Sequence, residues 1–100
     1  MTRRFYRNKI KFEWDEQKRL INIERHEIDF IEIPQLFDNW RHTIEDDRFD
    51  YGEVRYFTLG LLNGRIFALT HTETDDVIRI ISARKANKNE QAKYFKEITN

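Results

Sequence analysis

The first thirty residues combine an alternating apolar pattern with a helical one. The run Lys11–Trp14 alternates polar and apolar side chains and is typical of a short β-strand. Asp15 follows it and is a good N-cap for a helix that we expect to end near His26. We expect Leu20, Ile21 and Ile23 to supply the apolar side of this helix.

A second short helix is expected directly afterwards. Asp29 is its predicted cap, and Phe30, Ile33 and Phe37 would share one face. Pro34 opposes this prediction, because a proline inside a helix removes a backbone hydrogen bond. The alternative is a helix that begins at Ile33 and holds the proline in its first turn.

From Arg41 onward the pattern changes to runs of β-branched and aromatic residues, which predict strands. The runs are Arg41–Glu45, Val54–Gly60, Arg65–Thr72 and Val77–Ala83. We therefore expect an antiparallel sheet of about four to six strands.

Asn63-Gly64 lies between two of these runs and is the strongest hairpin signal in the chain, because both turn residues must accept positive φ. A two-residue turn pairs Leu62 with Arg65 and, further out, Tyr56 with His71. Alternation then divides the apolar side chains between the two faces, with Leu59, Leu61, Ile66 and Ala68 on one and Phe67 and Leu69 on the other.

Asn87 is predicted to cap a final helix from Lys88 to about Ile98. This helix would cover one face of the sheet with Ala92, Phe95 and Tyr94. The whole pattern predicts an α+β fold with two N-terminal helices, the sheet, and one C-terminal helix.

The composition fits a single domain over residues 1–100, because a chain of this length can bury only one apolar core. Residues 1–10 are basic and are expected to form a flexible N-terminus. No apolar run resembles a signal peptide or a membrane span, and the chain has no cysteine. We therefore expect a cytoplasmic protein that does not bind membranes.

Charge is distributed unevenly although the net charge is zero. Residues 1–25 carry eight basic and four acidic groups, residues 26–76 carry four and twelve, and residues 77–100 carry six and two. If the two ends meet in the fold, they would form a cationic patch suited to phosphates, and the acidic middle would suit a basic partner. The alternative is an ordinary solvated surface.

The residues that could carry out chemistry are mainly cations suited to binding phosphate groups. The three histidines form no ligand motif, so we expect no metal and no cofactor, and glycine-rich phosphate loops and serine-hydrolase motifs are absent. What remains is a set of cations on or beside the strands, namely Arg48, Arg55, Arg79, Arg84 and Lys85. The groups that could transfer protons are His71, His26 and Glu53.

RNA is a suitable substrate for such a set. Its 2′-hydroxyl can attack the adjacent phosphorus when a base removes the proton and cations stabilise the developing charge. The alternative is that the arginines pair with the acidic middle of the chain. Strict alternation also places Arg79 and Arg84 on opposite faces of their strand unless a bulge intervenes. For His71 the alternative is a buried, hydrogen-bonded histidine.

Three blocks of residues form a distinctive series across nearly the whole chain. They are Phe12–Asp15 with Lys18, Asn22, His26 and Phe30, then Asp47-Arg48 and Tyr51–Glu53 with Arg55, and finally Arg79–Ala86 with Glu90 and Tyr94. In this order and at these separations they resemble the BrnT toxin family.

The resemblance implies a fold similar to that of RelE-type ribonucleases. It also implies an RNA-cleaving toxin of a type II toxin–antitoxin system, which inhibits translation and growth. A BrnA-like antitoxin with a ribbon-helix-helix element would neutralise it, and the complex would repress the shared operon. DNA would be contacted only through that complex.

The resemblance also sharpens the candidate residues. Arg79 and Arg84 would contact phosphate and the transition state, Arg48 and Glu53 would be their neighbours, and His26 would either transfer a proton or cap its helix. The catalytic candidates are thus Arg79, Arg84, His26, Glu53 and Arg48. The RNA-binding candidates are Lys85, Arg55, His71 and Lys18.

One departure from the family pattern leaves a second function open. Family members often have Thr-Glu-Arg where this chain has Thr72-Glu73-Thr74, so one cation is missing. The alternative function is therefore a catalytically inactive protein that only binds the antitoxin and contributes to operon repression. Direct DNA binding by the chain is disfavoured, because no recognition helix is apparent.

Overall fold

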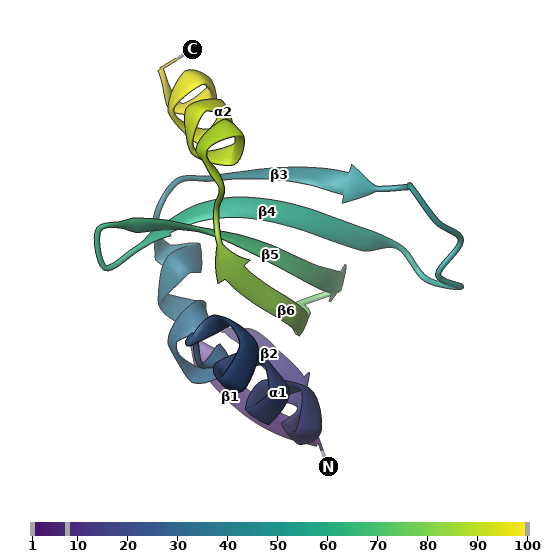
Figure 1. Ribbon diagram of the computed structural model, residues 1–100. Coiled ribbons are helices and arrows are strands. Elements are labelled where there is room, and N and C mark those ends of the chain that lie inside the picture. Colours follow the sequence, from purple (N-terminus) through teal and green to yellow (C-terminus); the bar gives the residue numbers. More distant parts are fainter. Residues whose placement is uncertain (1, 8, 100) are drawn as a thin grey trace.

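The computed structural model describes residues 2–7 and 9–99, which form one sheet with helical elements on its two sides (Figure 1). The elements in chain order are β1 (Thr2–Arg7), β2 (Ile10–Asp15), α1 (Glu16–His26), η1 (Phe30–Asp38), β3 (Arg41–Asp46), β4 (Arg55–Leu62), β5 (Arg65–Thr74), β6 (Val77–Lys85) and α2 (Lys88–Ile98). The predicted α+β class is confirmed.

The described strands form one six-stranded sheet in the order β1-β2-β6-β5-β4-β3. All neighbours are antiparallel except β2 and β6, which run parallel. The prediction of an antiparallel sheet is therefore wrong at this one pair. Parallel strands need a long connection, and here α1, η1 and three strands lie between β2 and β6 in the sequence.

The N-terminal residues form an edge strand. β1 pairs with β2 from Thr2 opposite Asp15 to Arg7 opposite Ile10, so residues 2–7 are part of the sheet, within the segment for which the sequence predicts a flexible N-terminus. Residues 1 and 8 lie outside the described part of the chain. The two helical elements consequently follow a β-hairpin rather than open the fold, which corrects the predicted arrangement.

The second helical element is a 3-10 helix. Asp29 caps it as predicted, since its side chain accepts a hydrogen bond from the Ile31 backbone N–H at 3.0 Å. The helix begins at Phe30 and continues through Pro34, so neither predicted α-helix is formed. Proline cannot donate the backbone hydrogen bond that an α-helix needs at this position, whereas short 3-10 segments are common connectors.

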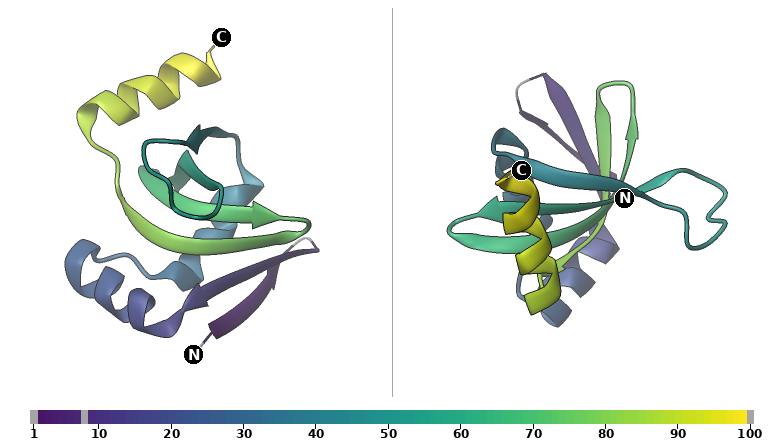
Figure 2. Two further views of the ribbon diagram at one scale, coloured as in Figure 1. Left: turned by 90° about the vertical axis from the view of Figure 1, so that its right-hand side faces the viewer. Right: turned by 90° about the horizontal axis from the view of Figure 1, so that it is seen from above.

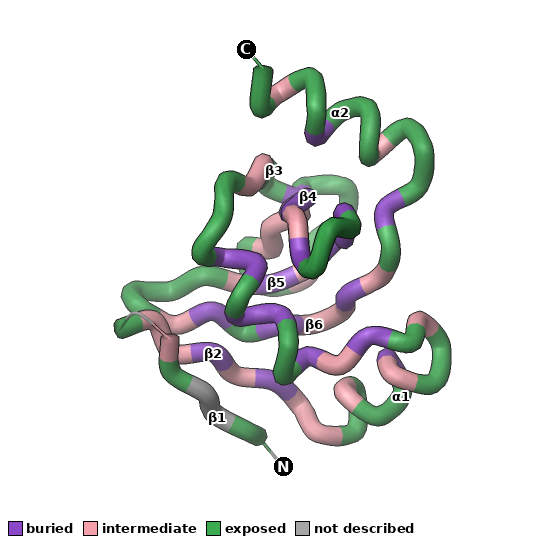
Figure 3. Tube along the Cα trace, turned by 90° about the vertical axis from the view of Figure 1, so that its left-hand side faces the viewer, coloured by how far each residue is buried: buried purple, intermediate pink, exposed green. Residues whose placement is uncertain are grey.

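Two apolar clusters lie on opposite faces of the sheet. The larger one fills the space between η1 and the sheet, and Phe30, Ile33 and Leu36 of η1 are completely buried in it. The smaller one lies under α2. Figure 2 shows α2 on the side of the sheet away from α1 and η1, and Figure 3 shows that both α-helices are largely exposed or half-buried. No helix in the described ranges is long and apolar enough to span a membrane.

The β4–β5 hairpin has the predicted register. Asn63 and Gly64 have φ values of 51° and 77°, and Leu62 lies opposite Arg65. The predicted division of apolar residues is confirmed. The smaller cluster contains Leu59, Leu61, Ile66 and Ala68, and the larger one contains Phe67 and Leu69.

The C-terminal helix has the predicted cap but a different buried side. Asn87 and Glu90 form a capping box. Tyr94 is buried and donates a hydrogen bond to the Trp40 carbonyl at 3.1 Å, whereas Ala92 and Phe95 are exposed. The predicted apolar side of this helix is therefore wrong for Ala92 and Phe95, because α2 packs through the neighbouring side that carries Tyr94.

Gly60 provides a stability prediction, because a Cβ there would lie 2.3 Å from Cδ2 of Leu36. Leu36 is completely buried and has little room to move. We expect Gly60→Ala to lower the free energy of unfolding in urea by about 1 to 3 kcal/mol. In the background of Leu36→Ala the same substitution should cost much less, and an equal cost in both backgrounds would contradict the steric explanation.

Candidate active site

A β-bulge brings the two predicted phosphate-binding arginines of β6 to the same face of the sheet. Thr70 lies opposite Ser82 but the next residue, His71, lies opposite Ile80, so Ile81 is an extra residue on β6. On one side of this bulge Arg79 pairs with Thr72, and on the other side Arg84 pairs with Ala68. Because alternate residues of β5 share a face, both arginines lie on the open side that η1 does not cover.

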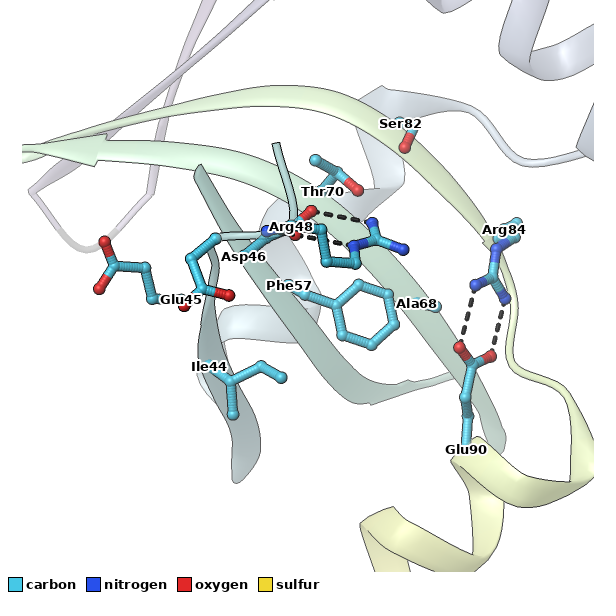
Figure 4. A pocket seen from close by; sticks show the side chains of 11 residues that line it. Ile44, Glu45, Asp46, Arg48, Phe57, Ala68, Thr70, Ser82, Arg84 and Glu90 are labelled. Carbon is cyan, nitrogen blue, oxygen red and sulfur yellow. Dashed lines mark hydrogen bonds and ion pairs between the residues drawn. The ribbon is translucent and has the colours of Figure 1, made fainter. Parts of the chain in front are cut away.

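The open face forms a pocket of about 440 Å³ beside α2 (Figure 4). Its floor consists of side chains from the central strands, and its charged groups come from β6, from α2, and from the end of β3 with the segment that follows it. The residues that line it are Ile44, Glu45, Asp46, Asp47, Arg48, Phe57, Ala68, Thr70, Ser82, Arg84 and Glu90. The pocket therefore brings Arg48 and Arg84 together, although they are far apart in the sequence.

Arg84 is held by Glu90 of α2. Its Nη1 and Nη2 atoms donate to the two carboxylate oxygens at 2.7 and 2.9 Å (Figure 4). These bonds raise the pKa of Arg84 and lower that of Glu90, so both groups remain charged. Since Nη1 also approaches the Lys85 carbonyl at 3.4 Å, the Nε–H and one Nη2–H are left for another acceptor.

Arg48 is held in the same way by Asp46. Its Nε and Nη2 atoms donate to the carboxylate at 2.8 and 2.9 Å, and the Tyr51 hydroxyl donates to it at 3.2 Å. Hydrogen bonding to Arg48 lowers the pKa of Asp46 to about 2. The Arg48 side chain is 70% exposed, so the remaining edge of its guanidinium group faces solvent. The nearby Arg48 charge has a smaller, opposite effect and lowers the pKa of Arg84.

A second pocket of about 310 Å³ lies beside the first and shares Arg84 with it. His26 and Lys85 line this pocket. His26 is in the last turn of α1, which continues from the end of β2 and packs beside β6. The structure thus brings together Arg84, Lys85 and His26, three residues predicted from the sequence.

Arg79 and Glu53 line a separate pocket of about 530 Å³ that includes neither Arg48 nor Arg84. Glu53 accepts a hydrogen bond from Arg55 at 3.1 Å, and the Arg55 guanidinium lies 4.2 Å from the centre of the Tyr51 ring. Arg79 thus lies on the same sheet face as Arg84 but lines a different pocket, further along β6.

Two predicted RNA-binding residues lie away from these pockets. His71 is completely buried on the covered face, where it stacks on Tyr56 and shares a hydrogen bond of 2.6 Å with Thr58 Oγ1. It cannot reach RNA in this structure, so the buried-histidine alternative applies. Lys18 is exposed in the first turn of α1 and does not line the pockets described above.

The buried His71 makes stability depend on pH. Burial, with a smaller effect of the Arg41 charge, lowers its pKa from 6.5 to about 4. Between these values the unfolded chain binds more protons, so we expect stability to be full above about pH 6.5 and to fall as pH decreases toward 4, by on the order of 3 kcal/mol. Urea denaturation at a series of pH values measures this change.

His71→Gln should remove this part of the pH dependence, because glutamine does not titrate. His42→Gln is the matched control, since His42 lies half-buried on the open face. An unchanged acid-side slope in His71→Gln, or its loss in His42→Gln, would contradict the assignment to His71.

Several site residues were missed from the sequence. Asp46, Thr70, Ser82 and Phe57 carry no sequence signal beyond their place in or beside a predicted strand. Glu90 belongs to the third block of the family resemblance and to the capping box with Asn87, but neither signal indicates that it holds Arg84. Its contact with Arg84 depends on the turn between β6 and α2.

Comparison with known proteins identifies the family to which the chain belongs. Among curated proteins, none matches the chain. A family model described as the ribonuclease toxin, BrnT, of type II toxin–antitoxin systems matches residues 14–90, which include the residues of all three pockets except Glu13. This match covers more than three quarters of the chain and confirms the resemblance found in the sequence. The chain therefore belongs to the BrnT family of ribonuclease toxins.

Proposed function

We propose that this protein is a metal-independent endoribonuclease whose cleavage site comprises the pocket between the open sheet face and α2 and the adjoining pocket of His26, which meet at Arg84. The observation that carries the proposal is the convergence of two carboxylate-held guanidinium groups, Arg48 and Arg84, with His26 beside the second of them. Arginine forks match the oxygens of a phosphate and keep their charge at all working pH values.

In the proposed reaction the 2′-hydroxyl of RNA attacks the adjacent phosphorus. His26 accepts its proton, the bond to the 5′-oxygen breaks, and that oxygen leaves with a proton from solvent. The products are a 2′,3′-cyclic phosphate and a 5′-hydroxyl. Arg84 and Arg48 stabilise the charge that builds up on the phosphorane oxygens.

The other predicted residues receive supporting roles. Arg79 has no ion-pair partner in the residues that the structure describes, and we assign it a contact with a neighbouring phosphate on the same face. Glu90 and Asp46 hold the guanidinium groups in position, which reduces the entropy lost when phosphate binds. Glu53 is assigned the orientation of Arg55.

The cellular part of the proposal follows from the family. Cleavage of cytoplasmic RNA would inhibit translation and growth, and a BrnA-like antitoxin would neutralise the toxin and bring it to operator DNA. The acidic middle of the chain, with twelve acidic and four basic groups over residues 26–76, offers a surface for a basic partner.

Purified protein and an RNA of defined sequence test the chemistry. We expect cleavage in the presence of EDTA, with products that carry 2′,3′-cyclic phosphate and 5′-hydroxyl ends when examined by mass spectrometry. Cleavage that requires added Mg²⁺, or products with 5′-phosphate ends, would contradict the proposal.

A second candidate function is an inactive fold that only binds the antitoxin. It is favoured by the pairing of both pocket arginines with carboxylates and by Thr74 in place of a cation. Expression with and without the neighbouring gene product distinguishes the two. Growth arrest with RNA breakdown, relieved by the neighbour, supports the ribonuclease, whereas normal growth with tight complex formation supports the binding protein.

A further inference from the structure

A groove of about 430 Å³ lies between α2 and the tip of the β4–β5 hairpin, outside the proposed cleavage site. Its walls belong to the β4–β5 hairpin, to α2, and to the end of β6 with the residue that follows it. The residues that line it are Leu61, Gly64, Arg65, Ile66, Lys85, Ala86, Gln91 and Phe95.

The groove has an apolar floor and an exposed aromatic ring. Ile66 and Ala86 are buried, and Leu61 packs against them. Phe95 is 55% exposed although it is one of the largest side chains of α2. Its ring lies edge-on to the Tyr94 ring, with 5.5 Å between the two ring centroids. A flat ring beside an apolar floor can stack on a planar group of similar size.

The charges of the groove have one sign. Arg65 and Lys85 line it, and no carboxylate does. Among the side chains that the structure describes, neither cation has an ion-pair partner, whereas Arg48 and Arg84 in the neighbouring site are both paired. The groove therefore suits an anionic ligand that also has a flat apolar part.

Two neighbouring residues at the end of β6 link the groove to the proposed cleavage site. Lys85 lines both the groove and the pocket of His26, and its neighbour Arg84 lines that pocket and the larger one. A single strand that places one phosphate at Arg84 would meet Lys85 next. A nucleotide has the required combination of a charged phosphate and a flat base.

We propose that this groove binds an unpaired nucleotide of the RNA, adjacent to the cleaved bond. Phe95 stacks on the base, and Lys85 and Arg65 bind the flanking phosphates. The Gln91 amide donates to the Ala86 carbonyl at 3.1 Å, which leaves its oxygen to accept a hydrogen bond from the base edge. The choice of RNA as ligand rests on the proposed ribonuclease function, and the lack of carboxylates disfavours a basic protein segment.

Binding of a fluorescent 2′-O-methyl RNA of about ten nucleotides tests this inference, because such an RNA cannot undergo attack by its own 2′-oxygen. We expect Phe95→Ala to weaken binding roughly tenfold without changing its salt dependence. Lys85→Ala should reduce the slope of log affinity against log salt by about 0.7, the value for one phosphate contact on a single strand. Anisotropy titrations at several salt concentrations give both quantities.

Two substitutions serve as matched controls. Leu20→Ala removes an exposed apolar side chain from α1, and Lys96→Ala removes an exposed cation from α2 outside the groove. Both should leave the affinity within about twofold, since neither lines the site.

The outcomes separate this inference from the ribonuclease proposal. Loss of binding in Phe95→Ala without RNA cleavage by the parent protein would retain the nucleotide site and reject the ribonuclease. Cleavage by the parent protein with binding that is indifferent to Phe95 and Lys85 would reject only the nucleotide site. Absence of oligonucleotide binding, or a Phe95→Ala variant that loses only its affinity for the antitoxin, would also overturn the inference.

Discussion

Arg84→Gln is expected to reduce RNA cleavage by about 100- to 1000-fold, since removal of one preorganised donor from an anionic transition state typically costs this much. Glutamine keeps a polar side chain but removes the charge and the planar fork. Arg84→Lys keeps the charge and should retain intermediate activity. The rate of cleavage of a defined RNA by each purified variant measures the effect.

Arg19→Gln is the matched control for loss of an ion pair. Arg19 on α1 is bonded to Glu16 and Asp29, as Arg84 is to Glu90, but it does not line the cleavage pocket. We expect this variant to cleave RNA at the parent rate. Activity of Arg84→Gln within about tenfold of the parent, with both proteins folded by circular dichroism, would contradict the assignment of Arg84.

Local signals predicted most elements of the fold. Asp15 and Asn87 each cap a helix, and Asn63-Gly64 sets the register of the β4–β5 hairpin. Each of these predictions depends on residues close together in the sequence, whose backbone preferences decide the structure. The BrnT resemblance, which the family match confirms, likewise depends on residues that can be read directly from the chain.

The remaining features depend on contacts between distant segments. The parallel pairing of β2 with β6 has no local signal, because it joins strands separated by most of the chain. On the buried side of α2, the Tyr94 hydroxyl donates a hydrogen bond to the backbone carbonyl of Trp40, which is 54 positions away in the sequence. Periodicity alone favours Ala92 and Phe95 over Tyr94, whereas the structure buries Tyr94 and leaves Ala92 and Phe95 exposed.

The candidate site could be predicted only in part, because its geometry also depends on contacts that local sequence does not encode. The arginines were identifiable by type, but their common face depends on the bulge at Ile81, which the alternation of β6 does not reveal. Each arginine has its carboxylate partner nearby in the sequence, Asp46 for Arg48 and Glu90 for Arg84. The end of β3 and the turn into α2 nevertheless decide how these partners are oriented. The hairpin turn correctly predicts that His71 lies opposite Tyr56, but its burial depends on η1, whose Phe37 ring packs against the His71 ring.

Asn22 links α1 to the sheet at the point where β6 loses its neighbour. β2 pairs with β6 only as far as Trp14 opposite Ile80 and then ends. Beyond it the Asn22 side chain accepts a hydrogen bond from the Ala83 backbone N–H at 3.1 Å and donates one to the Ile28 carbonyl at 3.0 Å. The buried amide thus satisfies one backbone group of β6 and one of the segment after α1.

We expect Asn22→Ala to lower the free energy of unfolding by about 3 to 5 kcal/mol, because two buried backbone groups lose their partners and a small void remains. Gln17→Ala on the exposed side of the same helix should change it by less than about 0.5 kcal/mol. Urea denaturation compares the two, and a loss below about 1 kcal/mol in Asn22→Ala would show that water replaces the amide. Because Asn22 also fixes the turn that follows His26, the folded fraction of this variant should cleave RNA more slowly than Gln17→Ala at the same concentration of folded protein.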